Sequence, residues 1–221
     1  MGGTGCALRP GTAGRERGEE PVMITAIVPA HNEGSRVGRA VAALWCQTRP
    51  PERVLVMSDG STDRTVEAAL LAGAEVLLTV DNAHRTAGAL NQALATVRLC
   101  PQDLVLIVDP AAELPPLFLD SAVAALADRN VGAVAAPPAL VRGGAVLIRW
   151  CALADVHAAY GHYYDEGPAL GHGRLALELG TVGWRLAVPG APAPAVPAAL
   201  SGEAGRGRPA VVGSAVVGVA S

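Results

Sequence analysis

The sequence predicts an α/β domain built on a mostly parallel β-sheet flanked by helices. Three short apolar runs have the length and β-branched composition of buried strands: Ile24–Val28, Val54–Met57 and Leu104–Val108. A polar cluster closely follows each run: His31-Asn32-Glu33, then Ser58 to Asp63, then Asp109. Helical stretches separate the runs, and this alternation gives parallel strands joined by right-handed crossovers. Since ligands of such sheets bind outside the carboxyl ends of the strands, the clusters predict a binding site there.

Capping residues and glycines set the limits of the first two helices. The first helix is expected over Ser35–Cys46, with Ser35 as N-cap because its hydroxyl can accept a free backbone N–H. The second is expected over Asp63–Ala72, capped by Asp63 or Thr62 and ended by Gly73. The other elements predicted up to residue 136 are strands Arg53–Met57, Ala74–Thr79 and Val131–Ala135 and helices Ala87–Arg98 and Pro116–Ala127.

The pattern weakens after Pro137, which divides the chain into unequal parts. We expect a strand at Ala145–Arg149, helices at Trp150–Tyr160 and Gly173–Leu179, and a strand at Arg185–Val188. The predicted organisation is a disordered leader over residues 1–21, a main α/β portion over 22–136, a shorter second half of the same domain over 137–189, and a Pro-, Ala- and Gly-rich tail over 190–221.

Composition excludes several classes of protein. The net charge is −3 and there is no basic block, so nucleic acid is not an expected partner. The four cysteines are scattered without metal-ligand spacing, which favours a reducing compartment over a disulfide framework or zinc site. No apolar run approaches the length of a transmembrane helix, and the first twenty residues lack the apolar core of a secretory signal. We therefore expect a cytoplasmic protein, either free or peripheral at the inner face of the membrane.

The first two polar clusters have the chemistry of nucleotide recognition. The turn from Pro29 to Glu33 places side chains and free backbone N–H groups at the edge of the sheet, although an ordinary βα turn has the same form. The carboxylate of Asp59 follows the second strand, where it can accept from a base N–H or from ribose hydroxyls. Asp63 also fits a purely structural role as a helix cap.

Four segments in order carry a resemblance to a known family: Ile27 to Glu33, Val56 to Thr65, Ala87 to Leu94, and Leu104 to Asp109. They resemble successive motifs of family 2 glycosyltransferases. The resemblance implies a GT-A fold, a nucleotide-diphospho-sugar donor, a divalent metal (Mg²⁺ or Mn²⁺), and inverting transfer to an acceptor that it does not identify, in the setting of cell-envelope polysaccharide. It makes residues 22–136 the nucleotide-sugar-binding portion and 137–189 an abbreviated acceptor-side half.

The same resemblance assigns donor-binding residues: Pro29, Ala30, Asn32, Glu33 and Asp59. Thr86 stands where the family often has a lysine, and the chain contains no lysine at all. The neighbouring Arg85 can supply the missing positive charge, because a guanidinium binds a diphosphate through paired hydrogen bonds. The alternative is that Arg85 is a solvated residue at the start of a helix.

The motifs for metal binding and catalysis depart from the family pattern. The resemblance makes Asp109 a metal ligand, but Ala111 stands at the second acidic position, and Glu113 compensates only if the loop bends back. Gly171 and His172 occupy the positions of the Glu-Asp pair that supplies the base.

The candidate base is therefore His172, whose imidazole suits proton transfer near neutral pH, or else Asp165 or Glu166. A third alternative is that no base survives. The chain would then be a catalytically inactive nucleotide-sugar-binding protein or a truncated remnant of a larger glycosyltransferase.

Overall fold

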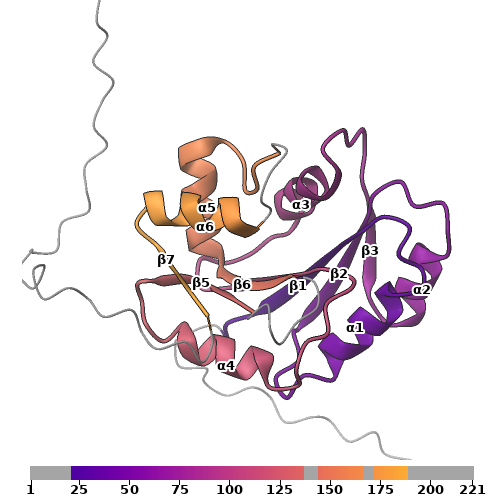
Figure 1. Cartoon of the computed structure of the whole chain (residues 1–221), viewed down its shortest axis with the longest axis horizontal. Helices are drawn as coiled ribbons and strands as arrows, with labels where there is room; N and C mark the ends of the chain where they lie inside the picture. The colour runs from indigo at the N-terminus through magenta and orange to yellow at the C-terminus, as the bar shows by residue number, and fades with distance from the viewer. Residues whose placement is uncertain (1–20, 137–143, 167–171, 189–221) are drawn as a thin grey trace, which may run out of the picture. The chain divides into compact units, whose positions relative to one another are not determined.

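The structure of the chain, a computed structural model, describes residues 21–136, 144–166 and 172–188. In these ranges a seven-stranded sheet has the order β3-β2-β1-β4-β6-β5-β7 (Figure 1). Its elements are β1 (Ile24–Ala30), α1 (Val37–Trp45), β2 (Arg53–Ser58), α2 (Thr65–Leu71), β3 (Glu75–Leu78), α3 (Arg85–Thr96), β4 (Leu104–Val108), α4 (Phe118–Ala125), β5 (Val131–Ala135), β6 (Ala145–Arg149), α5 (Trp150–Tyr160), α6 (His172–Thr181) and β7 (Arg185–Ala187).

The sheet is mostly parallel, as the sequence predicts. β1 pairs in parallel with both β2 and β4, and the pairs β2–β3 and β5–β7 are also parallel. The exception is β6, which runs antiparallel to β4 on one side and to β5 on the other. Because β6 lies between β4 and β5, the portion of the chain after Pro137 shares one sheet with the portion before it.

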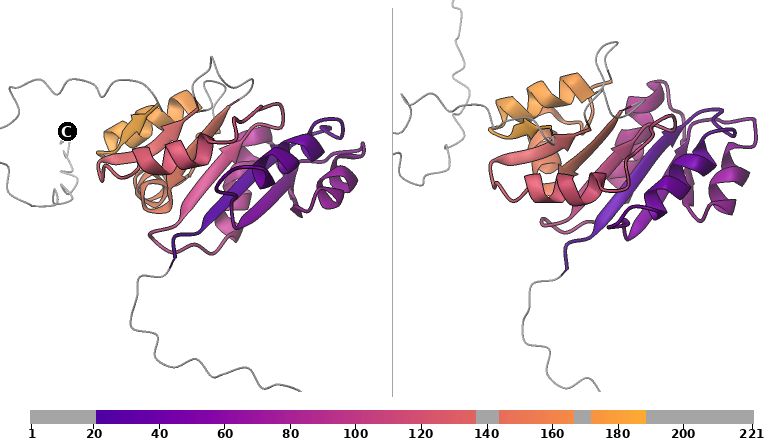
Figure 2. Two further views of the ribbon diagram at one scale, coloured as in Figure 1. Left: turned by 90° about the horizontal axis from the view of Figure 1, so that it is seen from below. Right: turned by 60° about the horizontal axis from the view of Figure 1, so that its bottom comes forward.

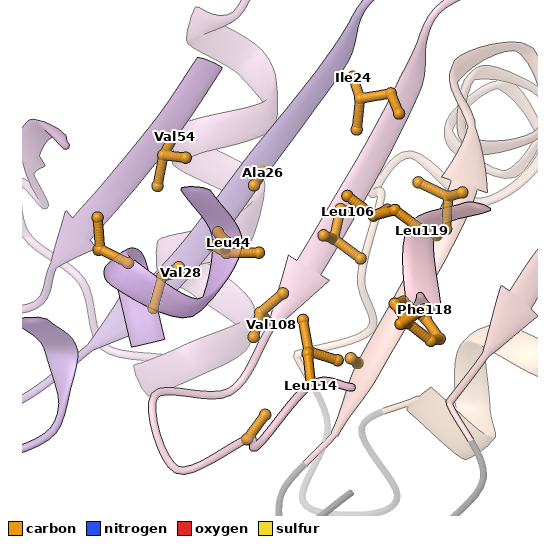
Figure 3. Close-up of a cluster of buried hydrophobic side chains, with 14 of the residues drawn as sticks. Ile24, Ala26, Val28, Leu44, Val54, Leu106, Val108, Leu114, Phe118 and Leu119 are labelled. Atoms are coloured by element: carbon orange, nitrogen blue, oxygen red, sulfur yellow. The ribbon is translucent and has the colours of Figure 1, made fainter. Parts of the chain in front are cut away.

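Helices cover both faces of the sheet, which explains why the central strands β1 and β4 are buried along their whole length (Figures 1 and 2). On one face α1, α2 and α4 pack against alternate residues of β1 (Ile24, Ala26 and Val28) and of β4, and Figure 3 shows much of this cluster. On the other face α3, α5 and α6 pack against the intervening residues, among them Ile27 of β1. All seven residues of β1 are buried in consequence.

Two predicted helix caps are wrong. Helix α1 begins at Val37, and the N–H groups of Arg36 and Val37 both donate to the carbonyl of Glu33 at 2.8 Å, so Ser35 is not the cap. Helix α2 begins at Thr65, with Arg64 at the cap position instead of Thr62 or Asp63. These helices start later because the loops before them bond to each other: the N–H of Gly34 donates to Asp63 Oδ2 at 2.9 Å.

The remaining boundaries agree with the sequence to within two residues, and Gly73 ends α2 with a positive φ of 87°. The predicted leader, apart from Pro21, and the predicted tail lie outside the described residues. Within the described ranges, no helix has both the length and the apolar character needed to cross a membrane.

Candidate active site

A cleft of about 430 Å³ lies where β1, β2 and β4 end. It is lined by residues from three loops and from the start of α3: Pro29, Ala30, His31, Glu33, Asp59, Arg85, Thr86, Ala89, Asp109 and Pro110. All of the predicted donor and metal residues line it, with the exception of Asn32. The ends of three strands and the start of α3 therefore bring together residues that lie between Pro29 and Pro110 in the sequence.

Asn32 lies beside the cleft and joins its two main loops. Its backbone adopts the left-handed conformation, with a φ of 53°, which asparagine tolerates better than most residues. The side-chain oxygen Oδ1 accepts from the N–H of Thr62 at 2.9 Å, and the backbone N–H of Asn32 donates to Ser61 Oγ at 3.1 Å. Asn32 therefore fixes the loop after β1 to the loop after β2.

His31 lines the cleft, although the sequence assigned it no role of its own. Its Nδ1 lies 2.5 Å from the carbonyl oxygen of Asp59, and its Nε2 lies 3.2 Å from Nδ2 of Asn32. A carbonyl only accepts and an amide nitrogen only donates, so these bonds fit a neutral ring protonated at Nδ1. Its place in the polar triplet after β1 was the signal available in the sequence.

The carboxylate of Asp59 is anchored at the cleft by a neighbouring strand. Thr79, which follows β3, donates from its hydroxyl to Asp59 Oδ1 at 2.7 Å. The backbone N–H of Asp59 donates to the carbonyl of Ala30 at 2.8 Å, so the end of β2 is also tied to the end of β1. The carboxylate is half-buried and remains an acceptor for hydroxyl or N–H groups of a ligand.

Arg85 is the first residue of α3, and it lines the cleft beside Thr86. Its φ of 50° is left-handed, and Asn82 Nδ2 donates to its carbonyl at 2.7 Å, so the turn before α3 holds this conformation in place. Within the described residues its guanidinium forms no ion pair, whereas Arg36, Arg39 and Arg64 each do. Arg85 thus brings a positive charge to the cleft.

Asp109 supplies the carboxylate of the predicted metal motif. Its Oδ1 accepts from the N–H of Ala111 at 2.7 Å, and the side chain is exposed in the cleft. Glu113 does not compensate for Ala111: it lines a different cleft beside α1, where its carboxylate lies 3.9 Å from the guanidinium of Arg39.

The protein side chains near Asp109 could hold a metal only if a substrate supplied some of the metal's ligands. No group of three His, Cys, Asp or Glu side chains suited to a metal occurs within the described ranges. Mg²⁺ commonly binds through one or two carboxylates together with phosphate oxygens and water. A single carboxylate from Asp109 is compatible with that arrangement and not with a metal held by protein side chains alone.

The structure does not bring the carboxylate base candidates into this cleft. Asp165 and Glu166 line a second cleft on the other side of α3. There Asp165 pairs with Arg174 at 3.2 Å, and Glu166 accepts from Asn91 at 3.0 Å. His172 is the first residue of α6, and its side chain lies outside the described part of the chain.

The sheet order and the cleft at its carboxyl edge define a GT-A glycosyltransferase fold. A solved mannosyltransferase from Pyrobaculum calidifontis, in complex with GDP-Man and Mn²⁺, has a similar fold: the TM-score is 0.60 at 23% identity, over 75% of this chain and 54% of that one. Glucosyl-3-phosphoglycerate synthase from Mycobacterium tuberculosis gives a TM-score of 0.55 at 19% identity, over 76% and 70% of the two chains.

The family is shown by the sequence itself. The model of glycosyl transferase family 2 matches residues 25–167, so this chain belongs to that family. A curated relative, 4,4'-diaponeurosporenoate glycosyltransferase from Staphylococcus aureus (strain bovine RF122 / ET3-1), is 43% identical over 60 residues. That stretch is 27% of this chain and spans only 16% of the relative's length.

Proposed function

We propose that this protein binds a nucleotide-diphospho-sugar in the donor cleft, the cleft lined by Asp59, Arg85 and Asp109, and transfers the sugar to an acceptor with inversion. The observation that carries the proposal is the convergence of these three side chains at one edge of the sheet. A carboxylate suits the hydroxyl and N–H groups of a nucleoside, and a guanidinium suits a diphosphate. The ligands of the similar solved proteins, GDP-Man and UDP, belong to the same chemical class.

Each of these residues has a distinct part in the proposed binding. Asp59, anchored by Thr79, accepts hydrogen bonds from the base or the ribose. Arg85 offsets the negative charge of the diphosphate, including the charge that develops when the sugar leaves. Asp109 would hold a divalent metal together with phosphate oxygens, and such an ion supplies further positive charge to the leaving group.

Inverting transfer also requires a base for the acceptor hydroxyl. The oxygen of the acceptor attacks the anomeric carbon from the side opposite the diphosphate, and the base takes the hydroxyl proton. His172 is our preferred candidate, because Asp165 and Glu166 lie in another cleft and are already bonded to Arg174 and Asn91.

A second candidate function is nucleotide-sugar binding without turnover. Two observations favour this alternative. Ala111 stands in place of a second acidic residue, and the carboxylate of Glu113 lies near Arg39 and not near Asp109. Under this alternative the donor cleft binds its ligand as described, but no transfer follows.

The experiment is to incubate the purified full chain with UDP-, GDP- and dTDP-sugars, with and without Mn²⁺, and to measure release of the nucleoside diphosphate. Transferase activity predicts release from at least one donor and loss of release in Asp109→Asn. Glu113→Gln is the matched control and should behave as the wild type. Binding of a donor without release under any condition supports the non-catalytic alternative, and absence of binding contradicts both.

A further inference from the structure

A second cleft, of about 600 Å³, lies on the side of α3 away from the donor cleft. Helix α3 is the wall between the two: its residues Arg85, Thr86 and Ala89 line the donor cleft, and Gly88, Asn91 and Gln92 line the second cleft. The opposite wall comes from the end of α5 and from the loop His162–Glu166, and α3 and α5 lie on the same face of the sheet (Figure 1). The proposed function makes no use of this cleft.

The walls of the second cleft are held by side-chain amides. Asn91 uses all of its hydrogen-bonding capacity on the loop after α5: Nδ2 donates to the carbonyl of Tyr164 at 2.9 Å and to Glu166 at 3.0 Å, and Oδ1 accepts from the N–H groups of Tyr163 and Tyr164. Gln92 bonds through both ends of its amide to the backbone of Val80. A cleft with fixed walls loses less entropy when a ligand binds.

Gly88 permits the close approach of the segment before α3. A Cβ on Gly88 would lie 2.0 Å from Asn82 Oδ1, so any larger residue would force the side chain of Asn82 to move. The packed segment brings His84 to 3.2 Å from the carboxylate of Glu166, which closes the cleft between α3 and the loop after α5.

Aromatic and imidazole rings are concentrated at this cleft. The whole chain has three tryptophans, three tyrosines, one phenylalanine and five histidines. His84, His157 and His162 line the cleft together with Tyr163. The ring of Tyr163 stacks on His157 with centroids 4.4 Å apart and lies 5.4 Å from the ring of Trp150. Tyr163 and His157 therefore form a ring platform at the wall, and flat rings bind apolar faces of ligands.

The charge of the cleft excludes anionic ligands. Asp81, Asp165 and Glu166 line it, and no arginine occurs among the described residues that do so. Arg174 pairs with Asp165, whereas Asp81 and Glu166 have no arginine partner among the described residues, so the cleft offers no fixed positive charge to an anion. A nucleotide or other phosphorylated ligand would be repelled. Carboxylates and imidazoles are, however, good partners for hydroxyl groups.

We infer that the second cleft binds a neutral saccharide, with an apolar sugar face on the ring platform and a hydroxyl bonded to the carboxylate of Asp81. The ring faces of the cleft suit the apolar face of a sugar, and its carboxylates suit the sugar's hydroxyl groups. The lack of positive charge favours an uncharged sugar over a phosphorylated one. Such a sugar would be a part of the acceptor remote from the reacting hydroxyl. That assignment rests on the proposed function, but the binding itself does not.

The test is saturation-transfer NMR on the full chain with three probes: methyl β-D-glucopyranoside, methyl α-D-mannopyranoside and glucosamine. The two variants are His157→Ala, which removes an exposed half of the ring platform, and Asp81→Asn, which keeps the size of the side chain at an exposed loop position. Trp45→Ala is the matched control, because its ring is also exposed but belongs to α1 on the other face of the sheet. UDP is titrated separately to report on the donor cleft.

The inference predicts saturation transfer to at least one methyl glycoside. We expect its affinity to fall about tenfold in each cleft variant, the factor that corresponds to one lost hydrogen bond or ring contact, and to stay unchanged in Trp45→Ala. UDP should not displace the glycoside. The inference would be overturned if neither glycoside showed saturation transfer, or if only the cationic glucosamine did. It would also be overturned if neither cleft variant changed the signal. UDP binding in the absence of glycoside binding rejects this inference alone, whereas glycoside binding that both cleft variants weaken supports it whether or not UDP binds.

Discussion

The hydroxyl of Thr79 donates to Asp59 Oδ1 at 2.7 Å, so a residue that follows the edge strand β3 orients the carboxylate that follows β2. The backbone N–H of Thr79 also donates to the carbonyl of Ser58 at 3.1 Å, which fixes the distance between the two strand ends. Asp59, which accepts ligand hydroxyls in the proposed donor site, is thus positioned by Thr79, a residue that does not itself line the cleft. A carboxylate with one anchored oxygen loses little freedom when a ligand binds to it.

Replacement of Asp59 should weaken nucleotide binding. Asp59→Ala removes an acceptor and leaves donor groups of the ligand unpaired, which costs about 1–3 kcal/mol. Thr79→Val should act in the same direction with a smaller effect, because it frees the carboxylate without removing it. Calorimetric titration with UDP and GDP measures both variants. Unchanged affinity in Asp59→Ala would remove this residue from the site.

Replacement of Arg85 should weaken the binding of a nucleoside diphosphate and leave the binding of the nucleoside unchanged. Arg85→Asn removes the charge and introduces a residue that tolerates the left-handed backbone at this position, where φ is 50°. We expect weaker binding of UDP, by about 1.5–3 kcal/mol for a lost charged hydrogen bond, and unchanged binding of uridine. Arg39→Ala, in a different cleft, is the control. An equal loss for UDP and uridine would mean that Arg85 shapes the site without contacting phosphate.

Metal binding should depend on the nucleotide. With Asp109 as the single protein carboxylate, Mn²⁺ alone should bind weakly, and the addition of UDP should strengthen its binding. Asp109→Asn should abolish this gain, and Glu113→Gln should not. Electron paramagnetic resonance of free Mn²⁺ follows the titration directly. Tight binding of Mn²⁺ without nucleotide would mean that protein side chains other than Asp109 also bind the metal.

The contact between the first two loops should make stability depend on pH through Asp63. Hydrogen bonds from the Thr65 hydroxyl and from the backbone of Gly34 lower the pKa of Asp63. The folded pKa lies below the unfolded value, so the stabilisation is complete above about pH 4 and is lost as the pH falls through the folded pKa. Asp63→Asn should therefore lower the urea midpoint at pH 7 and should have little effect at the lowest pH at which the protein folds. A deficit of equal size at both pH values would contradict the assignment.

Loss of His172 should abolish transfer and spare donor binding, because a base contacts the acceptor alone. For an imidazole base the rate should rise with pH and then level. The comparison is with Asp165→Asn and Glu166→Gln, which we expect to retain transfer. If a carboxylate variant is inactive and His172→Ala is active, the base lies in the cleft on the other side of α3.

The sequence predicted the strands of the sheet well, because buried parallel strands are continuous apolar runs. The bounds of β4, β5 and β6 are those expected from the pattern of apolar residues along the chain. The convergence of Asp59 and Asp109 also followed from their places after buried strands, whereas Arg85 was expected at the site only from the family resemblance. The antiparallel direction of β6 did not, because direction is decided by the path of the connecting segment and not by the residues of the strand.

The errors occurred where long-range contacts override local preference. Ser35 has the chemistry of a cap, but Gly34 bonds to Asp63, 29 residues further along, and moves the start of α1. Glu113 is near Asp109 in sequence, but it turns to Arg39 of α1. The second cleft was invisible in the sequence because its two walls, α3 and the loop after α5, are far apart in the chain: the partners of Asn91 lie 72–75 residues away.

The most direct test of the central claim is a crystal structure of the full chain with the nucleotide-sugar that gives the largest thermal shift. We expect the nucleoside within hydrogen-bond distance of the Asp59 carboxylate and the diphosphate within reach of the Arg85 guanidinium, on the side of α3 that faces Asp109. A nucleotide bound in the second cleft, or anywhere away from Asp59 and Arg85, would contradict that expectation.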